Sequence, residues 1–307
     1  MKVLDQNSSL LVRLVKGQLP LNPLWKKRSY RIKFLLRSYL VYRETLIWLN
    51  TLSGYPLLNE ILKKQTNLPC KLHRPYLANS MSRKMRHHAI TAHYDFLSKQ
   101  SPQLIKNLYQ LEPIILATIK GKAEQPFFLT LESNDKYSRE GELTFSICNS
   151  DNVVLATLTF AIIDYYGKLT LFIGGFQGSN HKHARELIQK TTKACFGVFP
   201  KHLVLQGALS FANYFGIKNI LAVTNKTHIY NNFRYRRRNK LRVADYDSYW
   251  QSLQSELIDN QYYQIPYQLK RKQIEDIPSK KRSEYRNRYI LLDQLNDDIH
   301  HHLSQLE

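Results

Sequence analysis

Two short phrases decide the fold: LTLFIGGFQG at residues 169–178 and GIKNILAVTN at residues 216–225. The first joins an apolar run to three glycines, so it predicts a strand that ends in a glycine-rich turn at 174–178. The second places a glycine, which can stop a helix, before a β-branched apolar run at 219–223 that is typical of a buried strand. Functional residues are expected in the loops where these two strands end.

Helices are predicted between these two strands, and further strands before them. Apolar spacing predicts one helix over 183–196, closed by Gly197, and another from Pro200 to Gly216. Upstream, apolar runs separated by turn residues predict strands at 127–131, 142–148, 153–163 and 168–173. An antiparallel meander followed by two helices and another strand indicates an α+β fold, with helices flanking the sheet.

The pattern divides the chain into three regions. Residues 1–125 are expected to be mostly helical and to include a basic amphipathic helix at 26–50. Residues 126–250 are expected to form the α+β core, with the glycine-rich turn and an arginine cluster. Residues 251–307 are expected to hold a linker and a basic C-terminal helix, starting near Ser279, that packs on the main body.

The amphipathic helix at 26–50 is rich in basic and aromatic residues. Its apolar stripe consists of Ile32, Leu35, Leu36, Tyr39, Leu40, Leu46 and Ile47. Two alternatives stay open: the stripe packs on the protein's own core, as in most amphipathic helices, or it contacts a membrane surface with its lysines and arginines among the headgroups.

Charge is the strongest compositional feature, with a formal net charge of +21 over 307 residues. Nine Lys or Arg residues and no acid lie between Asp5 and Glu44, whereas residues 126–180 hold three basic and six acidic side chains. Such clustering predicts attraction to polyanions, either nucleic acid or phosphorylated lipid, against the alternative of solvated basic faces.

Several features favour a cytoplasmic protein. Cys70, Cys148 and Cys195 are scattered and match neither a disulfide framework nor a zinc site, which favours a reducing compartment. The N-terminus lacks the apolar segment of a secretory signal, and the longest apolar run is about half a membrane span. Peripheral contact with the inner membrane is an option within this location, and the oligomeric state stays open.

The most function-like stretch follows the second strand, at residues 225–242. Arginines there alternate with aromatic rings, and such side chains bind phosphate oxygens and stack on flat groups. The predicted ligand-binding residues are Gly174, Gly175, Gln177, Gly178, Asn225, Arg234, Tyr235, Arg236, Arg237, Arg238, Asp245, Tyr246 and Trp250. Tyr230, His228 and Asp247 are the candidate catalytic residues for acid–base work.

Two of these assignments have structural alternatives. The glycines can approach a phosphate, or they can simply allow a tight strand exit. No histidine pair has metal-ligand spacing, so no metal is expected, and His93 is interpreted as a buried or hydrogen-bonded structural residue.

Several phrases of the chain also carry a resemblance to a known family. They are Gly174-Gly175-Phe176-Gln177-Gly178, Gly216-Ile217-Lys218, Ala222-Val223-Thr224-Asn225, His228-x-Tyr230, Arg234-Tyr235-Arg236-Arg237-Arg238 and Ala244-Asp245-Tyr246-Asp247-x-x-Trp250. On these the chain resembles the VirK/YbjX family of Gram-negative bacterial proteins, from about His73 to its end. It departs from the family where Gln251-Ser252-Leu253-Gln254 replaces a Glu-Leu-Gly-Gly-like phrase. The resemblance implies links to virulence, antimicrobial peptide resistance, envelope lipid remodelling and stress or DNA-damage responses, but no molecular activity.

A weaker resemblance is to the GNAT acyltransferase fold. It rests on the element order and on Gly216-Ile217-x-x-Ile220, Asn225 and Tyr230. It implies an acyl-CoA or acyl-carrier donor at the glycine-rich turn, with Tyr230 as general acid to the leaving thiolate. The extra helix at 183–196 and the short spacing from Asn225 to Tyr230 depart from that fold's pattern.

Three functions therefore stay open. The first is an accessory protein of envelope stress that binds an anionic, phosphate-bearing ligand, such as a phosphorylated lipid, through the arginine cluster. The second is an acyltransferase-like enzyme that uses an acyl-CoA or acyl-carrier donor. The third is a nucleic-acid binder in a DNA-damage or stress response, for which no helix-turn-helix, zinc-finger or RNA-binding signature is present.

Overall fold

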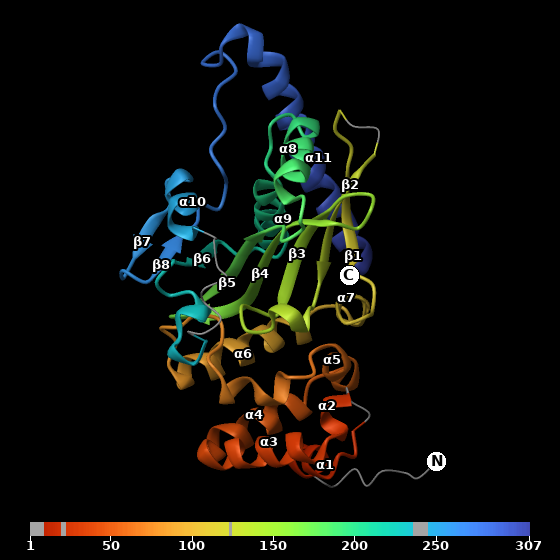
Figure 1. Ribbon diagram of the computed structural model, residues 1–307, viewed down its shortest axis with the longest axis vertical. Helices are drawn as coiled ribbons and strands as arrows, with labels where there is room; N and C mark the ends of the chain where they lie inside the picture. The colour runs from red at the N-terminus through yellow and green to blue at the C-terminus, as the bar shows by residue number, and fades with distance from the viewer. Residues whose placement is uncertain (1–8, 20–22, 123–124, 236–244) are drawn as a thin grey trace.

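A twisted sheet lies at the centre of the molecule, with helices from both ends of the chain packed around it (Figure 1). The structure is a computed structural model that describes residues 9–19, 23–122, 125–235 and 245–307. Helices and strands are mixed, with an antiparallel meander followed by two helices and another strand and with helices at both ends of the chain, so the α+β class is confirmed.

Helices occupy most of the N-terminal third and the C-terminal end. The α-helices of the described residues are α1 (Leu10–Lys16), α2 (Pro23–Lys26), α3 (Arg28–Leu40), α4 (Tyr42–Ser53), α5 (Leu58–Lys64), α6 (Arg83–Ser98), α7 (Pro102–Leu108), α8 (Ala184–Ala194), α9 (Pro200–Tyr214), α10 (Tyr246–Ser252) and α11 (Ser279–Leu306). Short 3₁₀ helices lie at Leu68–His73, Asp135–Tyr137 and Ile229–Asn231.

The described strands form one eight-stranded sheet in the order β1-β2-β3-β4-β5-β6-β8-β7. Their bounds are β1 (Ile114–Ile119), β2 (Phe127–Glu132), β3 (Leu143–Cys148), β4 (Val154–Tyr165), β5 (Lys168–Gly178), β6 (Asn219–Val223), β7 (Glu256–Ile258) and β8 (Tyr262–Gln264). β5 and β6 are parallel, because α8 and α9 form a crossover between them, and the other neighbouring strands are antiparallel.

The predicted glycine-rich turn at 174–178 is wrong, because these residues continue β5. The ladder between β4 and β5 shifts register once, between Thr159 and Phe160, and then pairs Thr159 with Gly175 and Ala156 with Gly178. Gly174 is therefore the extra residue of a β-bulge. The expected linker after Trp250 also contains structure, since β7 and β8 extend the sheet beyond β6.

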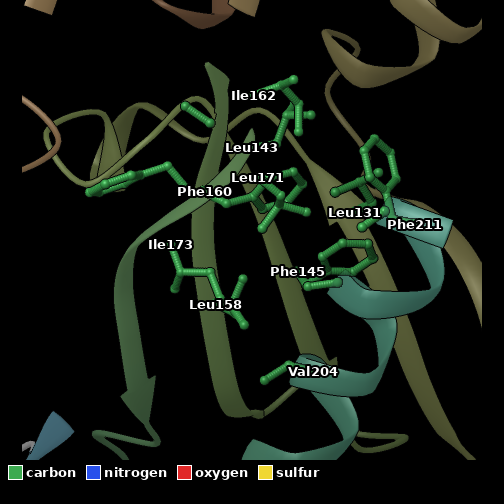
Figure 2. Close-up of a cluster of buried hydrophobic side chains, with 14 of the residues drawn as sticks. Leu131, Leu143, Phe145, Leu158, Phe160, Ile162, Leu171, Ile173, Val204 and Phe211 are labelled. Carbon is green, nitrogen blue, oxygen red and sulfur yellow. The ribbon is translucent and has the colours of Figure 1, made fainter. Parts of the chain in front are cut away.

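One face of the sheet packs against α9. Figure 2 shows Val204 and Phe211 of α9 directed toward the side chains of β3, β4 and β5. The Phe211 ring centroid lies 6.1 Å from that of Phe145 and 5.5 Å from that of Phe160, both in edge-on geometry. α11 packs beside α9 and β1, so the core on this face is apolar and closed.

The N-terminal helices form successive layers at the other end of the molecule, with α6 next to the sheet, then α4, then α3 (Figure 1). α6 packs along the half of β4 that extends beyond the end of β3. There the Ile162 N–H has His93 Nδ1 as its acceptor, at 3.1 Å. The structural role predicted for His93 is therefore confirmed, because the ring replaces a missing strand neighbour.

A buried ion pair lies at the same junction. Lys71 Nζ, in the 3₁₀ helix at 68–73, contacts Glu142 Oε1 just before β3, and the Tyr94 hydroxyl of α6 donates to Glu142 Oε2 at 2.9 Å. Burial lowers the pKa of Lys71, and the charge of Glu142 opposes that shift. We call Lys71, His93, Tyr94 and Glu142 the polar seam.

Two further sequence predictions need correction. The helix expected at 26–50 is divided among α2, α3 and α4, with breaks at Lys27 and at Val41, where φ is −137° and ψ is 45°. The region expected to be mostly helical, residues 1–125, also contains the edge strand β1, whose pairing with β2 is a tertiary contact that local spacing does not predict.

Candidate functional site

A buried carboxylate lies at the centre of the predicted site. Glu140 Oε1 lies 2.9 Å from His228 Nε2, and Gln177 Nε2 lies 3.0 and 3.1 Å from the two carboxylate oxygens. Glu140 and His228 are 1% and 0% exposed. We call these three residues the Glu140 cluster. Glu140 comes from the loop before β3, Gln177 from β5 and His228 from the loop after β6.

The glycines at 174 and 175 are required by Glu140. A Cβ at Gly174 would lie 2.0 Å from the Glu140 carbonyl oxygen, and one at Gly175 would lie 2.8 Å from the Glu140 carboxyl carbon. A side chain at either position would therefore displace the loop that carries Glu140. Close approach of the Glu140 backbone carbonyl to Gly174, and of the Glu140 carboxylate to Gly175, is a sufficient reason for both glycines. Their binding of an anion stays a prediction.

His228 has both ring nitrogens engaged. Nδ1 accepts from the backbone N–H of Tyr230 at 3.2 Å, so Nε2 carries the proton and donates to Glu140. The ring also lies 5.0 Å from the Tyr246 ring and 5.6 Å from the Tyr230 ring. In this arrangement His228 holds the loop after β6 against Glu140, and its predicted role in acid–base catalysis stays a prediction.

Asn225, Asp245 and Asp247 join that loop to the start of α10. Asn225 donates its backbone N–H to Asp247 and its side-chain amide to Asp245, at 2.8 Å each, and accepts from the Tyr246 N–H at 2.8 Å. Asp245 is the N-cap of α10. Hydrogen bonds from Ser248, then from Asn225, lower its pKa to about 2. Asp245 is thus held ionised at the start of α10. Asp247 accepts from the Asn225 backbone N–H, and its predicted catalytic role stays a prediction.

Tyr246 and Trp250 of α10 occupy the space where β5 and β6 diverge. The Tyr246 hydroxyl accepts from the Phe176 N–H at 3.1 Å, and Trp250 donates its indole N–H to the Val223 carbonyl at 3.0 Å. The Trp250 ring also stacks on Phe176 with centroids 5.0 Å apart. An acyl-CoA or acyl-carrier donor that entered between the ends of β5 and β6 would have to displace these buried rings.

The predicted arginine cluster lies only partly within the described residues. Arg236, Arg237 and Arg238 fall outside them. Arg234 donates to the His73 carbonyl at 2.9 Å, toward the N-terminal helices. The guanidinium carbon of Arg139 lies over the Tyr235 ring, 5.0 Å from the ring centroid. Arg139 also donates to the Tyr230 hydroxyl at 3.5 Å.

The predicted residues are therefore divided between two places. Gly174, Gly175, Gln177 and His228 meet at Glu140, whereas Arg234 donates to the His73 carbonyl. Gly178, at the end of β5, instead borders a cavity of about 550 Å³, which is within the range of roughly 300–1,000 Å³ for small-molecule sites.

This cavity, called the α9 cavity, lies between the end of β5, the start of α9, α10 and α11. Its described lining residues are Leu155, Gly178, Ile188, Gly197, Val198, Phe199, Pro200, Lys201, His202, Tyr249, Ser252, Leu253 and Arg288. Most are apolar, and every ionisable group of that lining except the Tyr249 phenol is basic.

Two of the basic groups, Lys201 and His202, lie in the first turn of α9, and the third, Arg288, comes from α11. Lys201 Nζ lies 4.8 Å from the Phe176 ring centroid and 5.9 Å from that of Tyr249. Burial lowers the pKa of Lys201, and the nearby Asp245 opposes that shift. Burial, and then the charge of Arg288, lower the pKa of His202. Arg288 itself donates Nε–H to the Phe196 carbonyl at 2.9 Å.

Comparisons with known proteins decide the family. Residues 23–301 match the family model described as "Protein of unknown function (DUF535)". The chain belongs to this family. It is 41% identical to protein YbjX of Escherichia coli (strain K12) over 95% of this chain and 88% of the relative. The VirK/YbjX-type membership predicted from the sequence is thus confirmed.

More distant relatives are also similar. An uncharacterized protein of Haemophilus influenzae is 31% identical over 66% of this chain and 65% of its own length. A Mannheimia haemolytica protein named "Membrane protein LapB" is 25% identical over 65% of this chain and 86% of its own length. No solved structure gives a significant match, so the likeness to the GNAT fold stays a prediction.

Sequence reasoning missed the residues that make the two places distinctive. Glu140 precedes a strand as one acid among several, and nothing local marks it as the partner of His228. Lys201 and Arg288 are distant in sequence and meet only through the packing of α11 on α9. The single local signal was Pro200, which marks the start of a helix. Within the described ranges, no group of three or more His, Cys, Asp or Glu residues is placed to hold a metal ion.

Proposed function

We propose that this protein binds an anionic amphiphile, a molecule with an acyl chain and a phosphate group, in the α9 cavity. One observation carries the proposal: the cavity is mostly apolar, while Lys201 and Arg288 put basic groups on its wall beside the His202 imidazole, whose pKa is lowered by burial. Apolar walls favour an acyl chain, and basic groups beside a helix N-terminus favour a phosphate. A nucleic acid would satisfy the basic groups but not the aliphatic walls.

Two sources present this chemistry, a lipid phosphate and an acyl-CoA or acyl-carrier donor. The lipid source agrees with the envelope remodelling and antimicrobial peptide resistance that the family resemblance implies, and with the name of the Mannheimia relative, "Membrane protein LapB". The acyltransferase alternative is less well supported, because Tyr230 and His228 are not among the lining residues of the cavity. The nucleic-acid and DNA-damage alternative would rest on the arginines at 236–238.

Titration calorimetry with three probes of equal chain length tests the proposal. The probes are a lysophosphatidic acid below its micelle concentration, the matching uncharged monoacylglycerol and the matching acyl-CoA. We expect the lysophosphatidic acid to bind much more tightly than the monoacylglycerol. Equal binding of acyl-CoA, together with release of free coenzyme A thiol only when a nucleophile is added to accept the acyl group, would favour the acyltransferase alternative. Binding of none of the three overturns the proposal.

Two variants locate the site. Lys201→Gln should weaken the phosphate-bearing probe about tenfold by removing a charge-assisted hydrogen bond, while Lys218→Gln, at an exposed lysine outside the cavity, should not. Gly178→Leu should block binding, because the added side chain would occupy the cavity that Gly178 lines. The fold should accept it, since a Cβ there would lie 3.9 Å from the Lys201 side chain with no other close contact. Gly54→Leu, outside the cavity lining, should bind normally. Unchanged binding in Gly178→Leu would place the ligand elsewhere.

A further inference from the structure

The outermost N-terminal helix presents its apolar stripe to solvent. Ile32, Leu35, Leu36, Tyr39 and Leu40 are 58%, 45%, 63%, 79% and 78% exposed. They are spaced i, i+3, i+4, i+7 and i+8, so they lie on one side of α3. The opposite side of α3 packs against α4 and the 3₁₀ helix at 68–73. Only Phe34 and Ser38 of α3 are buried there, so this side is narrower than the exposed stripe.

This surface continues into α4 and is bordered by basic residues. Tyr42 and Ile47 of α4 are 55% and 47% exposed. The exposed basic residues around the stripe are Lys26, Lys27, Arg28, Lys33 and Arg43. Between residues 9 and 50 the one acid is Glu44, which lies 3.8 Å from Arg83. We call this surface the α3 face. In Figure 1 α3 lies at the end of the molecule farthest from α11's first turns.

From this geometry we infer that the α3 face docks on an anionic membrane surface. A helix that lies in the plane of a bilayer needs an apolar stripe for the acyl region and cations beside it for the headgroups. Lys33 lies next to the stripe, and its aliphatic stem can extend along the apolar surface while its ammonium reaches the phosphates. Tyr39 and Tyr42 suit the boundary, because each has an apolar ring and a polar hydroxyl.

Other occupants fit the α3 face less well. A second copy would bring the same five exposed basic residues against each other, and like charges across an interface oppose association. A nucleic acid would leave Ile32, Leu36 and Leu40 without an apolar partner. Within the described parts of the chain, no helix is long and apolar enough to cross a bilayer. The inferred contact is therefore with the surface of one leaflet.

The α3 face is distinct from the α9 cavity. The cavity is lined by residues between 155 and 288, and the α3 face by residues between 26 and 47. Surface docking therefore does not depend on the proposed ligand. A variant that loses vesicle binding but keeps lysophosphatidic acid binding separates the two.

Vesicle flotation of the full-length chain tests the inference. One set of vesicles contains phosphatidylcholine alone, and the other contains one part phosphatidylglycerol to two parts phosphatidylcholine. We expect binding to the anionic set, weakened by raised ionic strength. Leu36→Asp/Leu40→Asp should lower binding to the anionic vesicles by about tenfold or more, because two exposed apolar side chains become charged. Thermal melts check that this variant stays folded.

Matched controls distinguish position from composition. Leu111→Asp/Ile290→Asp changes two apolar residues that are 90% and 53% exposed elsewhere, and it should bind as the wild type does. Lys33→Glu/Arg43→Glu should lose about tenfold or more on anionic vesicles, while Lys168→Glu/Lys218→Glu should lose far less. If the protein binds neither the anionic nor the neutral vesicles, the inference is overturned. Equal binding to neutral vesicles, or a dimer in solution that Leu36→Asp/Leu40→Asp dissociates, overturns it as well.

Discussion

The two helical coverings of the sheet differ in where their apolar side chains point. α11 turns its stripe inward, and Leu291, Leu292, Leu295, Ile299 and Leu303 are all buried. α3 has the same kind of periodic stripe and turns it outward. At the C-terminal covering the sheet meets an apolar layer, whereas at the N-terminal covering it also meets the polar seam of Lys71, His93, Tyr94 and Glu142.

This difference indicates how the N-terminal layers are positioned. Hydrophobic burial is non-directional, whereas buried hydrogen bonds and ion pairs are satisfied in one geometry only. The polar seam can therefore fix α6, and through α4 the outermost α3, without using the α3 stripe. An apolar stripe that is not needed for folding is available for a partner.

The largest expected effect contrasts the two stripes directly. Leu295→Asp places a charge in a buried position, where Leu295 is 2% exposed, and should lower the free energy of unfolding by more than about 4 kcal/mol. Leu36→Asp should change it by less than about 0.5 kcal/mol, because that side chain already faces water. Urea denaturation measures both. A comparable loss in Leu36→Asp would mean that α3 packs inward in solution.

Much of the sheet could be predicted from the sequence, because its signals are local. The strand at 219–223 matches β6 at both ends, and β2, β3 and β4 begin within one residue of prediction. β1, β7 and β8 were missed. β1 and β7 are the edge strands and β7 and β8 have only three residues each, and such strands are defined by their pairing rather than by their own pattern.

The site was less predictable for the same physical reason. His228 and Gln177 were selected, but Glu140, which joins them, comes from a loop 37 residues before Gln177. Periodicity likewise identified the stripe of the helix at 26–50 but could not tell which side of it faces the protein. That depends on the partner surface, which no local spacing encodes.

The polar seam is expected to show the next largest effect. Lys71→Met removes the cation from a buried pair and leaves Glu142 without it, which should cost about 3 kcal/mol. Lys71→Met/Glu142→Gln should recover most of that loss, because the uncompensated charge is gone while the Tyr94 hydroxyl keeps an acceptor. Additive losses in the double variant would show that Lys71 and Glu142 act independently and would contradict this account of the pair.

A smaller, pH-dependent effect is expected from His93. Burial, and then the charge of Lys71, lower its pKa to about 3, below the value of about 6.5 in the unfolded chain. The unfolded state therefore binds more protons between these values, and stability is lost as pH falls from about 6.5 toward 3. At pH 5 the loss should be about 2 kcal/mol.

Substitution separates this contribution from those of other acid-sensitive groups. His93→Asn keeps an acceptor near the Ile162 N–H and should reduce the slope of stability against pH below 6.5. His301→Asn, at an exposed histidine of α11, should leave the slope unchanged. An unchanged slope in His93→Asn would mean that His93 is not held neutral at the seam.

The smallest expected effect concerns how the two N-terminal layers begin. α6 starts at Ser82, whose hydroxyl accepts from the Met85 N–H at 3.2 Å, so Ser82→Ala should cost about 1 kcal/mol. α3 starts at Lys27, which has the extended conformation of a cap residue, with φ −75° and ψ 119°, but makes no side-chain cap bond. Lys27→Asn should therefore stabilise the protein by about 0.5 kcal/mol, measured as a shift in the urea midpoint. If Lys27→Asn stabilises the fold but weakens anionic vesicle binding, the lysine is retained at that position for the membrane rather than for the helix. If it does neither, the start of α3 is already fixed by the packing of Trp25 against Tyr30, whose ring centroids lie 5.0 Å apart.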